Sequence, residues 1–196
     1  MILLISNRIT DILIKNDIIF SKDKELYVFG IEQGSIMLLN IITTIIVGFA
    51  LGMAWQGIVV LIVYIQLRIY AGGFHAKTQL KCYLFSIGLT SAALLGIKMV
   101  PWTGFICLMV TIVASGIIFL LAPIEDSNKP LDQMELGIYK RRTRFILGSL
   151  LIMALLLWLL GQQQISICII MAVSLLAIML LLGELKNITI NKLCHE

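Results

Sequence analysis

Charged residues are scarce in this chain, and the polar connections between its apolar runs are short. Only 13% of its 196 residues are charged, whereas 60% are hydrophobic, and the mean hydropathy is +1.02. These values lie outside the range of soluble globular proteins. The short polar connections also leave no room for a soluble domain of ordinary size. We therefore expect one all-α integral membrane domain over 1–196, with no nucleic acid among its partners.

Residues that bind metals or form disulfides are also few. The chain has two histidines and four cysteines, and their positions match none of the spacings of zinc sites. No pair of cysteines falls in a predicted external segment, which argues against a disulfide framework. We expect neither a metal nor another cofactor.

The first twenty residues lack the unbroken apolar core and the small-residue cleavage site of a signal peptide. Apolar side chains such as Ile2, Ile5, Ile9 and Ile12 instead recur with a helical period, and polar residues lie mostly on the other side. This pattern predicts an amphipathic helix over 1–22 in the inner membrane interface. Such a helix anchors the chain, or it helps to dock a membrane-bound peptide substrate.

Six apolar segments approach or reach the ~17 to 25 residues that a membrane-spanning helix needs, the second being marginal. Very short links predict tight helical hairpins between the first two and between the last two. A four-span alternative stays open, in which the second segment and one other are re-entrant or lie in the interface. The segments lie near 34–52, 55–69, 82–100, 103–123, 145–161 and 164–183.

The basic residues give an independent test of this topology, because Lys and Arg stay on the cytoplasmic side of membrane proteins. With the amino terminus inside, six spans place all fifteen Lys and Arg residues except Lys98 on that side. The eleven carboxylates fall there too. We therefore expect a multi-pass membrane protein with both termini in the cytoplasm and its chemistry at the cytoplasmic face.

Residues 67–82 form a polar segment between the second and third apolar segments. His75, the only histidine outside the terminal residues, precedes Cys82 by seven positions. In one continuous helix they would stand about 10.5 Å apart along the axis, too far for proton transfer. Gly72 and Gly73 offer a break in the backbone before His75.

A second helix start comes after this break. Thr78 is a candidate N-cap for a helix that begins at Gln79, which would place Cys82 in its first turn. The helix dipole, Lys77 and Lys81 would favour the thiolate there. His75 would act on Cys82 from the preceding loop or across two subunits, unless both residues are merely structural. Cys107 and Cys168 serve as internal controls for a catalytic Cys82, because they lie in apolar spans, where a thiolate is disfavoured.

Two separated motifs support a more specific interpretation. The first comprises Arg68, Ala71-Gly72-Gly73, Phe74-His75-Ala76, Thr78 and Cys82, and the second is Ala-Pro-Ile-Glu-Asp-Ser-Asn-Lys-Pro-Leu at 122–131. Together with the amphipathic amino terminus, residues 27–32 and the six apolar segments, they resemble the accessory gene regulator B (AgrB) family of bacterial quorum-sensing peptidases. The resemblance extends over nearly the whole chain.

This resemblance implies a cysteine endopeptidase in the bacterial cell membrane, with His75 and Cys82 as its catalytic residues. Its substrate would be an AgrD-like precursor autoinducer peptide, which loses its carboxy-terminal tail and is cyclised to a thiolactone or lactone. The alternatives are a small peptide transporter or exporter and a non-catalytic scaffold, although charges confined to the span ends weaken the transporter. Membrane lipids and a second copy in a homodimer complete the expected partners.

Other polar residues are candidates for support or substrate binding. Backbone N–H groups near Lys81 could hold an oxyanion, a carboxylate or amide could orient His75, and Glu32 could pair with Arg68. The charged loop predicted at 124–144 either fixes the topology or receives an acidic peptide tail. The candidates are Glu32, Arg68, Gly72, Gly73, Lys77, Thr78, Lys81, Asp126, Asn128, Lys129, Lys140, Arg141, Arg142 and Arg144.

Overall fold

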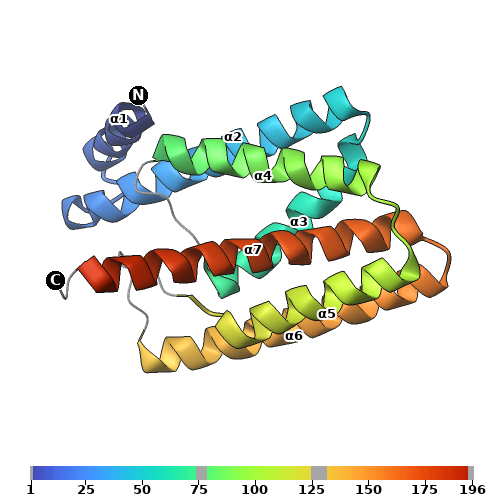
Figure 1. The fold of residues 1–196 in the computed structure, drawn as a ribbon. Coiled ribbons are helices and arrows are strands. Elements are labelled where there is room, and N and C mark those ends of the chain that lie inside the picture. Colours follow the sequence, from blue (N-terminus) through green and yellow to red (C-terminus); the bar gives the residue numbers. More distant parts are fainter. Residues whose placement is uncertain (1, 74–78, 125–131, 194–196) are drawn as a thin grey trace. The chain divides into compact units, whose positions relative to one another are not determined.

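The computed structural model describes residues 2–73, 79–124 and 132–193, and this part of the chain is built from helices (Figure 1). A short 3-10 turn, η1 (Ser21–Asp23), separates the first two helices. The α-helices of the described residues are α1 (Ile2–Lys15), α2 (Lys24–Leu51), α3 (Ala54–Ala71), α4 (Gln79–Met99), α5 (Gly104–Leu121), α6 (Gln133–Leu159) and α7 (Gln163–Leu193).

These helices confirm the predicted class of all-α membrane protein. Among the described residues, five helices have the length and hydropathy of a membrane span, and α4, with 21 residues, is the sixth candidate. Each predicted apolar segment corresponds to one of α2 to α7. The second segment, marginal by sequence, forms the 18-residue helix α3. A helix of that length is about 27 Å long, close to the thickness of the hydrocarbon core.

The chain divides into two compact units, residues 1–43 and 44–196. In the first unit α1 ends at Lys15, so the amphipathic helix predicted over 1–22 is too long. Its end is set by Asp17, which has a φ of 55°, and by the Ile18 N–H, which donates to the Leu13 carbonyl at 3.0 Å. Lys24 Nζ of α2 lies 2.6 Å from Asp11 Oδ1 of α1. The apolar side chains of Leu3, Leu4, Ile5, Ile9 and Ile12 are exposed, as an interfacial helix requires.

Helix α7 is the centre of the second unit. It packs against α3, α4, α5 and α6, with α4 on one side and α5 and α6 on the other (Figure 1). Cys168, Ala172, Leu176 and Leu180, spaced four residues apart, are fully buried along it. Small side chains such as Cys168 and Ala172 let neighbouring helices approach α7 closely, as is usual where helices pack in a membrane.

Glycines end the helices at the two predicted hairpins. Gly52, with a φ of 70°, follows α2, and the next N–H, that of Met53, donates to the Gly48 carbonyl at 2.6 Å. Gly161, with a φ of 80°, follows α6, and the Gln162 N–H donates to the Leu157 carbonyl at 2.9 Å. Positive φ angles of this kind are accessible to glycine at little cost. The α6–α7 hairpin, whose two helices pack against each other, is therefore confirmed, whereas for α2 and α3 only the short turn is confirmed.

The predicted loop 124–144 is wrong over its second part. Helix α6 begins at Gln133, so residues 133–144 are helical and extend the span that we expected to start at 145. The Asp132 N–H donates to Glu135 Oε2 at 3.4 Å, and the Leu136 N–H donates to the Asp132 carbonyl at 2.9 Å. A residue pair with this spacing and this bond forms one half of a capping box, which marks a helix start.

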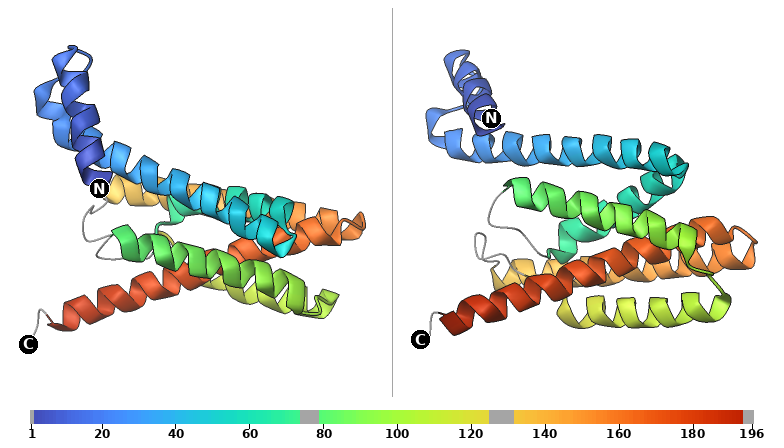
Figure 2. Two further views of the ribbon diagram at one scale, coloured as in Figure 1. Left: turned by 90° about the horizontal axis from the view of Figure 1, so that it is seen from above. Right: turned by 45° about the horizontal axis from the view of Figure 1, so that its top comes forward.

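Helices α6 and α7 converge at their connecting turn and diverge toward the end where α6 begins and α7 ends (Figure 2). Helix α3 packs against both of them. Its Leu67 and Ala71 have no exposed surface, and Thr143 of α6 is 1% exposed. The last turn of α3 is therefore held inside the helix bundle, at the point where the polar segment leaves it.

Candidate active site

The candidate site begins where α3 stops. Helix α3 ends at Ala71, and Gly72 follows with a φ of 71° and a ψ of −141°. The Gly72 N–H still donates to the Arg68 carbonyl at 3.0 Å, so the last helical hydrogen bond is made before the chain turns away. This conformation is one that L-residues rarely adopt, and the break predicted at Gly72 and Gly73 is confirmed.

The segment after α3 pairs with the segment after α5. Gly72 and Ile124 form a parallel β-bridge, in which the Ile124 N–H donates to the Ala71 carbonyl at 3.0 Å. A Cβ atom on Gly72 would overlap the Ile124 carbonyl oxygen, well inside the 3.0 Å that real Cβ atoms keep. Only glycine allows so close an approach. Two motifs that are about fifty residues apart in the sequence therefore meet through their main chains.

Both partners of this bridge are fixed by their surroundings. Ala122 caps α5 in an extended conformation and is 6% exposed, and Ile124 is 7% exposed. Gly73, with a φ of 127°, passes along α7, where a Cβ atom on it would lie 3.5 Å from the Met179 carbonyl oxygen. The chain therefore leaves α3 between the end of α5 and the middle of α7.

Helix α4 begins at Gln79, as Thr78 and Gln79 predicted. Lys81 and Cys82 are its third and fourth residues, so both belong to the first turn. The N–H groups of a first turn have no partner within the helix and favour negative charge nearby. The position of Cys82 in the first turn is therefore confirmed, and its role as a thiolate stays a prediction.

Several predicted residues lie outside the described part of the chain. These are His75, Lys77, Thr78, Asp126, Asn128 and Lys129. Glu32 belongs to the first unit and Arg68 to the second, and their pairing stays a prediction.

Arg68 instead has a neighbour that the sequence analysis missed. Its Nη1 donates to the Tyr64 hydroxyl one turn earlier in α3, and its guanidinium carbon lies 5.6 Å from the centre of the Tyr64 ring. The spacing of four residues on one helix could have indicated this pair.

Two arginines of the basic cluster at 140–144 on α6 contact aromatic side chains. Arg142 Nη1 donates to the Tyr70 hydroxyl at 3.2 Å, and its guanidinium lies 5.3 Å from the centre of that ring. The Tyr70 ring also meets the Tyr139 ring edge-on, with centroids 6.0 Å apart. Tyr70 directly precedes Ala71 and Gly72. Arg142 therefore ties α6 to the turn that begins the candidate site.

Arg144 makes a similar contact on the other side of α6. Its guanidinium carbon lies 3.9 Å from the centre of the Phe119 ring, and its Nη2 lies 3.5 Å from the Phe119 carbonyl near the end of α5. Carbonyls at the end of a helix lack partners within the helix, and a cation there is favourable. No sequence signal joins Arg144 to Phe119 or Arg142 to Tyr70, because each pair lies on different helices.

The two control cysteines lie in the core. Cys168 has no exposed surface and Cys107 is 5% exposed, as expected of packing residues. Within the described ranges no three His, Cys, Asp or Glu side chains are grouped so that they could hold a metal ion.

The fold and the site define a multi-pass helical membrane protein with a candidate site built from helix ends. A family model described as accessory gene regulator B matches residues 6–180. The chain belongs to this AgrB family.

Curated relatives agree with this assignment. Proteins named "Putative AgrB-like protein" from Listeria welshimeri and Listeria innocua are 31% and 32% identical to the chain over 133 residues. These alignments cover 65% of this chain and 63% of each relative. One of the same name from Clostridium perfringens is 26% identical over 143 residues, which cover 69% of this chain and 64% of the relative. The chain thus spans less than two thirds of these relatives' length. No solved structure matches it.

Proposed function

We propose that this protein is a membrane cysteine endopeptidase that removes the carboxy-terminal tail of a quorum-sensing precursor peptide and supports its cyclisation. Cys82 is the nucleophile and His75 its base. The single observation that carries the proposal is the main-chain pairing of Gly72 with Ile124. It joins the two motifs of the family at one place in the fold.

The pairing matters because a polar residue comes shortly after each partner in the sequence. His75 comes two residues after Gly73, and Asp126 comes two residues after Ile124. Because each of these polar residues lies within three residues of the bridge, the lengths of the two segments allow their side chains to come close to each other. This supports Asp126 as the group that orients His75, as a third residue does in other thiol enzymes.

The first chemical step is acyl transfer to sulfur. His75 accepts the Cys82 proton, and Sγ attacks the carbonyl carbon of the residue before the tail. The S–C bond forms, the peptide C–N bond breaks, and the proton passes from His75 to the leaving amine. Main-chain N–H groups in the first turn of α4, beside Lys81, are available to stabilise the oxyanion.

The second step keeps the acyl group activated. A thiol or hydroxyl inside the bound peptide attacks the thioester, which closes a thiolactone or lactone ring and releases the Cys82 thiolate. The proton of the attacking group returns to Cys82 through His75. Exchange of a thioester for a thiolactone is close to energy-neutral. A site partly covered by membrane and peptide also limits competing hydrolysis.

The distribution of basic residues supports a cytoplasmic site with both termini inside the cell. The ends of α3 and α5 and the start of α4 then face the cytoplasm, whereas the α2–α3 and α6–α7 turns face outward. Substrate arrives from within the cell. The six predicted apolar segments carry no charge except Arg68 and Lys98 near their ends, which disfavours a transporter with ionisable groups at mid-membrane.

The test is cleavage of a co-expressed precursor peptide by four single variants. Cys82→Ser and His75→Ala should abolish cleavage, whereas Cys107→Ala and Cys168→Ala, which alter buried packing residues, should retain it. Membrane levels of each variant are measured in parallel. A non-catalytic scaffold would instead tolerate the first two changes, so cleavage by Cys82→Ser would exclude the proposed nucleophile.

A further inference from the structure

The third and fourth turns of α6 hold four basic residues and no carboxylate. Lys140, Arg141, Arg142 and Arg144 fall within five residues, and all four are exposed. Among the described residues none of the four forms an ion pair with Asp or Glu. No described carboxylate therefore neutralises this cluster by direct contact.

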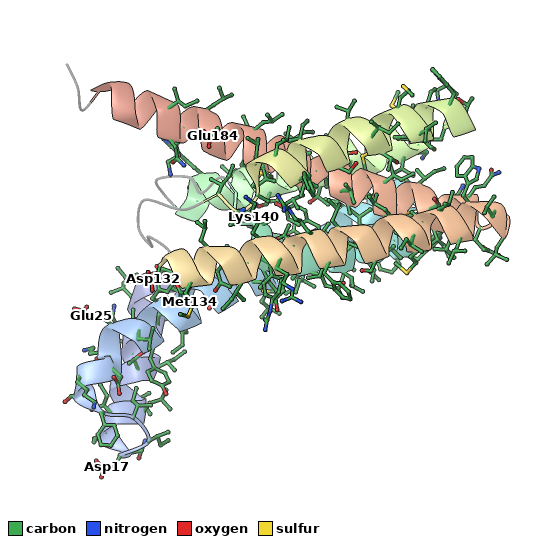
Figure 3. The ribbon with its side chains drawn as sticks, turned by 90° about the horizontal axis from the view of Figure 1, so that it is seen from below. Asp17, Glu25, Asp132, Met134, Lys140 and Glu184 are labelled. Atoms are coloured by element: carbon green, nitrogen blue, oxygen red, sulfur yellow. The ribbon has the colours of Figure 1, made fainter. Side chains whose placement is uncertain are left out.

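The four side chains have different surroundings. Arg142 is held by Tyr70 of α3, and Arg144 by Phe119 of α5, so these two stabilise the position of α6 between its neighbours. Lys140 and Arg141 have no hydrogen-bond or ion-pair partner among the described residues. Their charged groups are therefore available to an outside ligand. Figure 3 labels Lys140 on α6, less than two turns after Met134.

Arg141 lies on an apolar face of α6. Met134, Ile138 and Phe145 are 76%, 47% and 78% exposed, and with Arg141 they follow the spacing of one helical face. Phe145 lies one turn deeper into the apolar part of the helix, and Ile138 lies one turn closer to its start. An exposed cation between exposed apolar residues is typical of the boundary between headgroups and acyl chains.

We propose that Arg141, together with Lys140 and Arg144, binds the headgroup of an anionic phospholipid in the adjacent leaflet. Residues three and four positions apart are neighbours on a helix, so all three cations can reach one phosphate. A guanidinium binds a phosphate through two parallel N–H bonds, and Arg144 has donors left beside its bond to Phe119. The acyl chains lie along Phe145.

The apolar residues on the same face favour a lipid over an acidic peptide as the ligand. An acidic peptide from solution would bind the cations but would not contact Ile138 and Phe145. A phospholipid can bind the cations with its headgroup and contact these apolar residues with its acyl chains. The inference does not depend on the proposed peptidase activity, because lipid binding is measured in the resting protein.

Native mass spectrometry of the full chain in detergent tests the proposal, with phosphatidylglycerol and phosphatidylcholine added in separate titrations. The wild type should bind phosphatidylglycerol more tightly. Arg141→Gln should weaken that preference by about fivefold, and Lys140→Gln with Arg141→Gln by roughly twenty-five-fold, as expected for each cation near an anionic surface. Arg141→Lys should restore most of it.

The matched control is Lys98→Gln. It removes one positive charge in the last turn of α4, far from the basic cluster of α6, and should leave the preference for phosphatidylglycerol unchanged. Inorganic phosphate at the same concentration should not displace the lipid, because it lacks acyl chains. Equal binding of both lipids by the wild type, or equal effects of Arg141→Gln and Lys98→Gln, would overturn the proposal. So would an Arg141→Gln variant that binds phosphatidylglycerol normally but no longer binds an acidic peptide.

Discussion

Replacing Gly72 by alanine tests the main-chain pairing on which the candidate site is built. Gly72 has a φ of 71° and a ψ of −141°, a conformation that costs a residue with a Cβ about 1–3 kcal/mol. The new methyl group would also overlap the Ile124 carbonyl oxygen, so the bridge must open. Loss of the bond from the Ile124 N–H to the Ala71 carbonyl leaves buried polar groups unpaired, at a cost of about 1–3 kcal/mol.

The two costs act on the same segment, so we expect Gly72→Ala to lose about 2–6 kcal/mol of stability there. Thermal unfolding of the purified protein in detergent measures the change, and cleavage of a co-expressed precursor reports on the site. Cleavage should fall by at least tenfold even where the helices stay folded, because opening the bridge separates the two motifs.

Two glycine variants serve as controls. Gly148→Ala alters a helical position of α6 with nothing within 4 Å of the new Cβ, and it should keep cleavage and equal or exceed the wild-type unfolding temperature. Gly73→Ala has a φ of 127° but an ordinary 3.5 Å contact with the Met179 carbonyl, so it should give an intermediate loss. If Gly72→Ala matched Gly148→Ala in both assays, the bridge would have no part in the site.

Other substitutions test the packing around the site. Thr143→Val removes a buried hydroxyl without a hydrogen-bond partner among the described residues, and it should raise stability by up to about 1 kcal/mol in thermal unfolding. Ser166→Ala removes a buried hydroxyl that donates to the Ala154 carbonyl at 2.8 Å, so the same measurement should show a loss of about 0.6–1 kcal/mol. Arg142→Leu removes the stacking and the bond to Tyr70 and should cost about 1 kcal/mol, whereas Tyr70→Phe keeps the stacking and should cost about half as much. A loss of stability in Thr143→Val, a gain in Ser166→Ala, or equal losses in Arg142→Leu and Tyr70→Phe would contradict these assignments.

Helix ends marked by glycine could be predicted from the sequence. Gly52, Gly72 and Gly161 all have positive φ angles where the apolar segments stop, and α4 begins where Thr78 and Gln79 indicated. These features depend on local backbone preferences, which one sequence contains in full. The start of α6 was missed, although Asp132 and Glu135 have the spacing of a capping box. Four closely spaced basic residues suggested a loop more strongly than that pair suggested a helix.

Contacts between distant segments could not be predicted. Gly72 and Ile124, or Arg142 and Tyr70, are brought together by the packing of α3, α5, α6 and α7, and no local pattern encodes those pairs. The central position of α7 is a partial exception. Small residues such as Cys168 and Ala172 at a spacing of four favour close helix packing, but the sequence does not say which neighbours surround α7.

The central claim is that Cys82 forms a thioester with the precursor peptide. Intact-mass measurement of the purified protein after brief incubation with a precursor that lacks its internal thiol or hydroxyl tests this most directly, because the ring cannot close and the acyl-enzyme accumulates. The account predicts an added mass equal to that of the tail-less peptide minus one water, sensitive to hydroxylamine, located at Cys82 and absent from Cys82→Ala. An adduct on Cys107 or Cys168, or cleavage of the precursor by Cys82→Ala, would contradict it.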